Sequence, residues 1–277
     1  MVSLEKYRRT AKIGRYKLSY LQKGRGKPLV FLHGFLGSSY SFRHVFEELS
    51  LKNKLIVPDL PGCGQSSKPP RLDYMVGTQM SIVMRLLEQL KLKEVIIGGV
   101  STGGAVALNF ALEYPRMLKK LILVDSFGLK FQGRERRTLF GIKLSGDIYA
   151  HLSDPEQLAK VYQRQFNQKH RPTPEDREMF TQQSQHKNVI ECAAKMLNSN
   201  RMFEVFGIQR IETPTLVVWG ERDKILPKNM AERYVRVLPD ARYVMIPEAG
   251  HLPHEESPED FLTVVRGFIE DSIPSNT

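Results

Sequence analysis

The chain has 277 residues, 41% of them hydrophobic, which suits one large α/β domain with or without an insertion. No stretch approaches the roughly 20 uninterrupted apolar residues that cross a bilayer, and the N-terminus lacks the apolar run of a signal peptide, so we expect a cytoplasmic protein. The two cysteines, Cys63 and Cys192, have no Cys or His at ligand spacing, which argues against a disulfide framework and a metal site. We expect neither a metal nor a cofactor.

The net charge of +11 is concentrated near the N-terminus, where residues 1–27 carry nine Lys and Arg against one Glu. A basic segment can bind nucleic acid, but basic side chains also keep exposed edge strands from pairing with other molecules. Over residues 15–20, larger apolar side chains alternate with Arg15, Lys17 and Ser19, which indicates strands with one buried and one outward face. We therefore expect no nucleic-acid partner.

The first half of the chain alternates strand and helix patterns. Strands are expected at 5–13, 15–22, 28–32, 54–57, 94–97 and 121–125, and helices at 41–49, 73–90 and 105–114. Pro115 ends the last of these helices. Apolar strands that alternate with helices predict a parallel sheet covered on both faces.

Residues 127–210 show no strand pattern and several helix starts. Asp154-Pro155 and Thr173-Pro174 each supply a helix cap followed by a proline, and a third helix is expected at 186–204. We therefore expect an all-helical cap at 127–210, inserted after the sixth strand into a core made of residues 1–126 and 211–277. In the second part of that core, strands are expected at 214–219 and 241–246, and helices near 228–237 and 257–270.

The motif on which the functional prediction rests is Gly99-Val100-Ser101-Thr102-Gly103, between the strand 94–97 and the helix 105–114. A strand that turns sharply into a helix exposes its central serine, and the residues two positions away must be very small. The N–H groups and the positive dipole end of the helix lie behind the serine. The alternative is a glycine-rich turn in which Ser101 only caps the helix.

Two later loops carry the groups that such a serine needs. Asp223 follows the strand 214–219 and His251 follows the strand 241–246, and in a parallel sheet both loops lie at the same edge as Ser101. A serine is a poor nucleophile unless an imidazole takes its proton, a role that we assign to His251. Asp223 would hold that imidazole. Asp125, which also ends a strand, is the rival acid, and His254 is the rival base.

Together with His33-Gly34-Phe35 and residues 59–66, these motifs resemble the α/β hydrolases in order and spacing. The resemblance covers essentially the whole chain and implies the α/β-hydrolase fold, with a mostly parallel central sheet, helices on both faces and a helical cap. It implies that the backbone N–H groups of Phe35 and Thr102 form the oxyanion hole. It further implies that four residues shape the elbow and the oxyanion turn: Gly99, Gly103, His33 and Gly34.

Some branches of this family fit the sequence less well. Haloalkane dehalogenases and epoxide hydrolases use aspartate at the elbow, where this chain has Ser101. Carbon–carbon bond hydrolases of ring-cleavage products usually have Asn before the nucleophile and Trp after the histidine, where this chain has Val100 and Leu252. We therefore expect a serine carboxylesterase acting on a small-molecule ester with a small to medium acyl chain. The alternatives are a carbon–carbon hydrolase, an enzyme that transfers the acyl group to an acceptor other than water, and a small-ligand receptor. The oligomeric state stays open.

Overall fold

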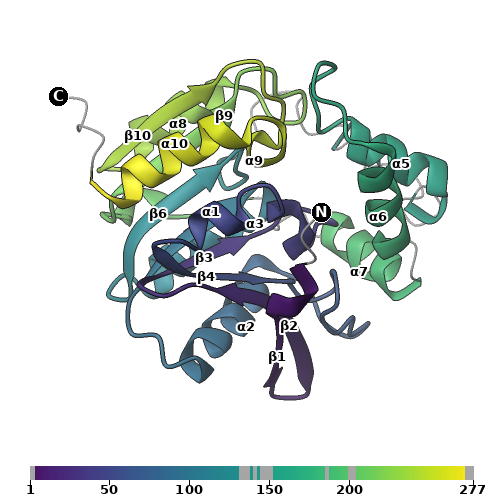
Figure 1. Cartoon of the computed structure of the whole chain (residues 1–277), viewed down its shortest axis with the longest axis horizontal. Coiled ribbons are helices and arrows are strands. Elements are labelled where there is room, and N and C mark those ends of the chain that lie inside the picture. The colour runs from purple at the N-terminus through teal and green to yellow at the C-terminus, as the bar shows by residue number, and fades with distance from the viewer. Residues whose placement is uncertain are drawn as a thin grey trace.

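The computed structural model describes residues 4–130, 138–139, 142–143, 152–184, 187–198 and 204–271. Its centre is an eight-stranded sheet (Figure 1), and the strands in sequence order are β1 (Arg8–Ile13), β2 (Tyr16–Lys23), β3 (Lys27–Leu32), β4 (Asn53–Pro58), β5 (Val95–Val100), β6 (Leu118–Val124), β9 (Thr215–Gly220) and β10 (Ala241–Ile246). Their order across the sheet is β1-β2-β4-β3-β5-β6-β9-β10. The strands from β4 to β10 are parallel, while β2 pairs antiparallel with both β1 and β4.

Helices cover both faces of this sheet because successive strand residues point to opposite sides. The longer helices of the core are α2 (Val76–Gln89), α3 (Thr102–Glu113), α8 (Asn229–Val237) and α10 (Pro258–Ile269). Val30 of β3 belongs to a hydrophobic cluster with Met80 of α2, whereas its neighbour Phe31 belongs to a second cluster with Phe261 of α10. The predicted α/β architecture is confirmed.

The N-terminal hairpin differs from the prediction in two respects. Residues 4–7 form a short 3-10 helix, η1 (Leu4–Tyr7), so the first strand begins only at Arg8. Ser19, expected to face outward, is buried. Its hydroxyl accepts a hydrogen bond from Arg8 Nη1 at 3.0 Å, and its N–H donates to Ser66 Oγ at 2.8 Å. The reason is that β2 is an inner strand and the loop 59–66 covers its second face.

The helix expected at 41–49 is divided into two short pieces, η2 (Ser39–Phe42) and α1 (Phe46–Leu49). The Ser38 hydroxyl accepts a hydrogen bond from the Tyr40 N–H and so begins the first piece two residues early, at Ser39. A further short helix, α9 (Pro253–Glu256), follows β10 and precedes α10.

The insert between β6 and β9 contains α5 (Pro155–Gln163), α6 (Pro174–Ser184) and α7 (Lys187–Asn198), which lie together beside the sheet (Figure 1). The prediction that the insert is all helical is wrong. An antiparallel pair of two-residue strands, β7 (Thr138–Leu139) and β8 (Ile142–Lys143), lies within it, and Gly128 bridges Glu204. Strands of two residues are too short to show a periodic pattern, and a glycine at 141 between Leu139 and Ile142 was the available signal.

Two predicted helix limits in the insert can be compared with the structure. Asp154 caps α5 as expected, because its side chain accepts a hydrogen bond from the Glu156 N–H at 2.8 Å. The helix expected at 186–204 ends at Asn198 in α7, and residues 199–203 lie outside the described residues. In the part of the chain that the structure describes, no helix has the length and apolar character needed to span a membrane.

Candidate active site

Ser101 occupies the sharp turn between β5 and α3. Its backbone has φ 54° and ψ −118°, a strained conformation for a residue with a side chain. The surroundings hold it there, since the Ser101 N–H donates to the Val124 carbonyl at 2.9 Å and the Ser101 carbonyl accepts from the Phe127 N–H at 3.1 Å. Strain of this kind requires a structure that over-determines it, and such strain is concentrated at functional sites.

Two glycines let the strand and the helix meet at this turn. A Cβ on Gly99 would lie 2.3 Å from the Gly103 carbonyl oxygen, and a Cβ on Gly103 would lie 2.4 Å from the Leu32 carbonyl oxygen. Both contacts are with backbone, which cannot move aside as a flexible side chain can. The close packing of β3, β5 and α3 therefore depends on the absence of side chains at both positions.

The structure brings three of the predicted residues into one hydrogen-bonded chain. His251 Nε2 lies 2.9 Å from Ser101 Oγ, and His251 Nδ1 lies 2.8 Å from Asp223 Oδ2. The side chains of His251 and Asp223 are fully buried. The other oxygen of Asp223 accepts hydrogen bonds from the N–H groups of Ile225 and Leu226 at 2.7 and 3.1 Å, which fixes the orientation of the carboxylate.

The rival acid, Asp125, lies next to this chain but makes different contacts. Its Oδ1 accepts a hydrogen bond from the Gly220 N–H at 2.9 Å, and its Oδ2 has no hydrogen-bond partner among the described groups. Burial and the adjacent Asp223 raise the pKa of Asp125 well above its usual range. The site of Asp125 therefore disfavours a charge, and Asp223 is the acidic side chain that faces the imidazole.

Asp125, Asp223 and His251 are also the one cluster of His, Cys, Asp and Glu in the described ranges whose ligand atoms lie close enough to hold a metal, within 4.8 Å of one another. Both nitrogens of His251 are already used, one by Ser101 and one by Asp223. The hydrogen-bond pattern therefore matches a proton-transfer site better than a metal site.

The rival base, His254, belongs to a different environment. Its Nε2 lies 2.9 Å from Ser41 Oγ, and its ring packs on Phe42 with centroids 4.9 Å apart. Burial lowers the pKa of His254 to about 3, so the ring is neutral at ordinary pH. The geometry favours His251 over His254 as the partner of Ser101.

The turn after β3, which the sequence predicts to form part of the oxyanion hole and which we call the oxyanion turn, is organised by His33. The Leu60 N–H donates to His33 Nε2 at 2.9 Å, which leaves the proton on Nδ1, where it is donated to the Gly34 carbonyl at 2.8 Å. A Cβ on Gly34 would lie 3.1 Å from Ser101 Cβ, so this turn borders the serine. Phe35 is the next residue, and Thr102 begins α3, where helix N–H groups have no intrahelical partner.

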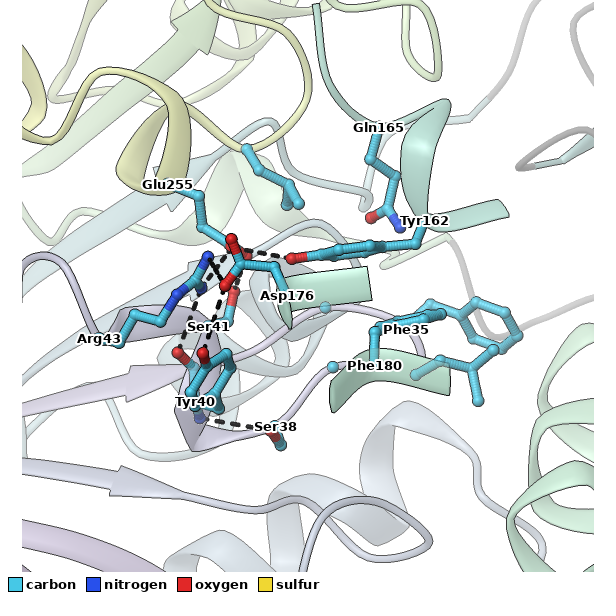
Figure 2. Close-up of a pocket in the computed structure, with 14 residues that line it drawn as sticks. Phe35, Ser38, Tyr40, Ser41, Arg43, Tyr162, Gln165, Asp176, Phe180 and Glu255 are labelled. Atoms are coloured by element: carbon cyan, nitrogen blue, oxygen red, sulfur yellow. Dashed lines mark hydrogen bonds and ion pairs between the residues drawn. The ribbon is translucent and has the colours of Figure 1, made fainter. Parts of the chain in front are cut away.

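A pocket opens beside the oxyanion turn, with an empty volume of about 460 Å³ that is partly open to solvent. The turn itself forms one wall, and the insert forms another through Tyr162, Gln165 and Phe180 (Figure 2). Leu252, next to His251 in the chain, also lines the pocket. Core and insert residues therefore line this pocket together, next to the loop that carries His251.

Sequence reasoning missed a buried charge cluster at this pocket. Figure 2 shows Arg43 between two carboxylates, with its Nη1 2.6 Å from Glu255 and its Nη2 2.8 Å from Asp176. Tyr40 donates to Asp176 and Tyr162 donates to Glu255, both at 3.2 Å. Asp176 and Tyr162 belong to the insert, whereas Arg43 and Glu255 belong to the core. The cluster therefore joins the two, and no local sequence pattern indicates it.

The class of protein follows from a comparison with known families. Residues 27–258 match the family model of the alpha/beta hydrolase fold. The chain belongs to this family, and the resemblance found in the sequence is confirmed.

Individual relatives narrow the class further. The chain is 32% identical to Lipase 1 of Psychrobacter immobilis over 91% of this chain and 80% of the lipase. It is 30% identical to the uncharacterized hydrolase YugF of Bacillus subtilis over 92% and 94% of the two chains. A solved thermophilic esterase from Thermogutta terrifontis, in a malate-bound form, has a TM-score of 0.80 and 28% identity over 95% and 98%. The protein is thus a hydrolase with lipase and esterase relatives.

Proposed function

We propose that the protein is a serine carboxylesterase that cleaves esters of small to medium acyl chains through Ser101, His251 and Asp223. The observation that carries the proposal is the unbroken hydrogen-bond chain from Ser101 Oγ through both nitrogens of His251 to Asp223. The lipase and esterase relatives support the ester as the bond that is cleaved.

The geometry supports a two-step acyl transfer. Because the Asp223 carboxylate accepts a hydrogen bond from Nδ1–H, the free lone pair of Nε2 faces Ser101 Oγ and can remove its proton as the oxygen attacks the ester carbonyl. The resulting oxyanion would be stabilised by the N–H groups of Phe35 and Thr102. His251 then returns the proton to the departing alcohol, which leaves an acyl ester on Ser101. Water, deprotonated by His251, hydrolyses that ester and restores the serine.

The proposal extends to the insert. We infer that residues 127–210 act as a cap on a core of residues 1–126 and 211–277, because insert residues form a wall of the pocket beside the oxyanion turn. Phe35, Leu36 and Phe180 give this pocket apolar surface, which suits an acyl chain.

The test is steady-state hydrolysis of p-nitrophenyl esters of increasing acyl length by the wild type, Ser101→Ala and the matched control Ser81→Ala. Ser81 is an exposed serine of α2 whose hydroxyl donates only to the Gly77 carbonyl. We expect turnover by the wild type and the control, background rates from Ser101→Ala, and an optimum at short or medium acyl length. Equal rates in the wild type and Ser101→Ala would contradict the assigned nucleophile, and no turnover of any ester would contradict an esterase.

The same purified protein can be used to distinguish the three alternative functions that the sequence left open. A carbon–carbon hydrolase would cleave a ring-cleavage-type diketone and no ester. An acyltransferase would divert the acyl group from water to an added alcohol. A receptor would release at most about one product molecule per chain.

A further inference from the structure

The loop that carries His251 is held by the insert as well as by the core. The segment that follows α5 runs along this loop, and the His251 N–H donates to the Gln165 carbonyl at 2.7 Å. Two residues further on, the Asn167 side chain donates from Nδ2 to the Glu248 carbonyl at 2.5 Å. The backbone of the histidine loop therefore has hydrogen-bond partners in the insert on both sides of Gly250.

A buried carboxylate completes this contact. Glu256 Oε2 accepts hydrogen bonds from the Gly250 N–H at 2.9 Å and from the Asn167 N–H at 2.7 Å. Its Oε1 accepts from the Leu252 N–H at 3.2 Å. One side chain thus binds the residue before His251, the residue after it and the insert. Above its pKa of about 7, the Glu256 carboxylate can accept all of these bonds, whereas a glutamine in its place would present an amide N–H to one of the donors.

The glycine before the histidine reflects the same close approach. A Cβ on Gly250 would lie 2.7 Å from Asn167 N, 2.8 Å from the Gln165 carbonyl oxygen and 2.9 Å from Glu256 Oε1. The first two of these atoms are insert backbone. Gly250 is therefore required because the insert packs against the histidine loop at this point.

We propose that the insert segment 165–167, joined to the loop by Glu256, is a second support for the catalytic histidine, and that His251 reaches Ser101 only while this segment is docked. Asp223 sets the orientation of the ring, and the segment sets the position of the backbone that carries it. Glu256 and Asn167 are positioning residues, since neither touches Ser101. The inference rests on the proposed function, because it assigns a support to the base of that reaction.

A small displacement of the imidazole has a large effect on rate. A misplacement of about 1 Å can cost on the order of 100-fold in rate when a reaction depends on a near-attack geometry. Loss of the support should therefore lower kcat and leave KM nearly unchanged, because the pocket and its charge cluster are intact. A role limited to fold stability would lower the melting temperature and leave kcat of the folded protein unchanged.

The experiment compares wild type, Asn167→Ala, Glu256→Gln and the matched control Lys195→Met in ester turnover and thermal unfolding. Lys195 is an exposed residue of α7 that donates to the Pro70 carbonyl, another contact between insert and core. We expect kcat to fall about 10-fold in Asn167→Ala and about 100-fold in Glu256→Gln, with KM within about twofold. Lys195→Met should keep the wild-type kcat. If both variants keep kcat within about twofold of wild type, the proposal is overturned.

A second readout does not depend on turnover. The low-field proton resonance of the hydrogen bond between His251 Nδ1 and Asp223 reports whether the ring is held in place. We expect it in the wild type and in Lys195→Met, and we expect it to broaden or disappear in Glu256→Gln and Asn167→Ala. An unchanged resonance in both variants would overturn the second support, even if no ester is a substrate. Should Glu256→Gln fail to fold, Asn167→Ala decides the question, because it leaves the three hydrogen bonds to Glu256 in place.

Discussion

Ser101 and His251 form one hydrogen-bonded pair, but two different parts of the molecule hold them. Ser101 is fixed mainly by the core, through the β6 carbonyl of Val124 and the close packing of Gly103 against β3, and only the N–H of Phe127, the first residue of the insert, adds to this among the hydrogen bonds described above. His251 is held on one side by Asp223 and on the other by Gln165 of the insert. We therefore expect changes in the segment 165–167 of the insert to displace His251 and alter the pocket, while Ser101 stays in place.

The largest expected effect comes from the elbow. Gly103→Ala places a Cβ 2.4 Å from the Leu32 carbonyl oxygen, so the strand and the helix must separate, at a cost of about 3–5 kcal/mol in the free energy of unfolding. Activity should disappear with it. The control Gly77→Ala lies in α2, where the nearest atom to the new Cβ is 3.8 Å away, and should stabilise the protein by about 0.5–1 kcal/mol. Chemical unfolding measures both, and a tolerated Gly103→Ala would contradict the rigid elbow.

The next largest effect should come from the acid in the core. Asp223→Asn should lower kcat by roughly 10⁴-fold, because an amide N–H facing Nδ1 favours the wrong tautomer of the imidazole. Asp125→Asn should keep kcat within about tenfold, since Asp125 does not face the imidazole and an amide oxygen can still accept the Gly220 hydrogen bond. Steady-state kinetics of both variants distinguish the two acids. If Asp125→Asn is the damaging change, the assignment of Asp223 is wrong.

A smaller effect should come from the insert side of the histidine loop. Gly250→Ala pushes a methyl group against the insert backbone, and we expect kcat to fall about 10–100-fold with a loss of about 1–3 kcal/mol in stability. The difference from Gly103→Ala is that the protein should still fold and Ser101 should still be presented. A Gly250→Ala enzyme with wild-type kcat would show that the insert does not position the base.

The smallest effect concerns acid stability. The pKa of His254, lowered to about 3 by burial, lies below its value in the unfolded chain, so the unfolded chain binds the extra proton between about pH 6.5 and 3. His254 alone should lower the free energy of unfolding by about 2 kcal/mol when the pH falls from 8 to 5. His254→Asn should remove that loss, as measured by chemical unfolding at both pH values.

Glu256 should change the stability with pH in the direction opposite to His254. Burial raises the pKa of Glu256 to about 7, so the folded state binds this proton more tightly than the unfolded chain, and its contribution grows as the pH falls from about 7 toward 4.5. Wild type and Glu256→Gln should therefore differ in the slope of stability against pH, with the variant losing more stability in acid. An identical slope would contradict the raised pKa.

Most of the fold could be predicted from the sequence because its signals are local. Apolar strands alternate with helices, and the carboxyl ends of parallel strands collect the loops that carry Ser101, Asp223 and His251 at one edge. The short β7–β8 pair was missed because two residues per strand show no period. The burial of Ser19 was missed because a loop 47 residues away in the sequence covers it.

The supports of the candidate site could not be predicted in the same way. Arg43 and Glu255 are 212 residues apart, and Asn167 and Glu256 are 89 residues apart. In the sequence each of them is an ordinary charged or polar residue, of a kind found mostly at the surface. Only the packing of the insert on the core shows that they are buried and paired.

The pairing of β6 with β9 has a consequence for how this protein can diverge. Leu121 pairs with Thr215 in the sheet, although the chain between them passes through the entire insert. The entropy of closing a flexible loop grows only logarithmically with its length, and each doubling adds about 0.6 kcal/mol. Segments of very different size can therefore be exchanged at this junction while the strands beside it stay paired, which makes substrate range easier to change over evolution than the chemistry itself.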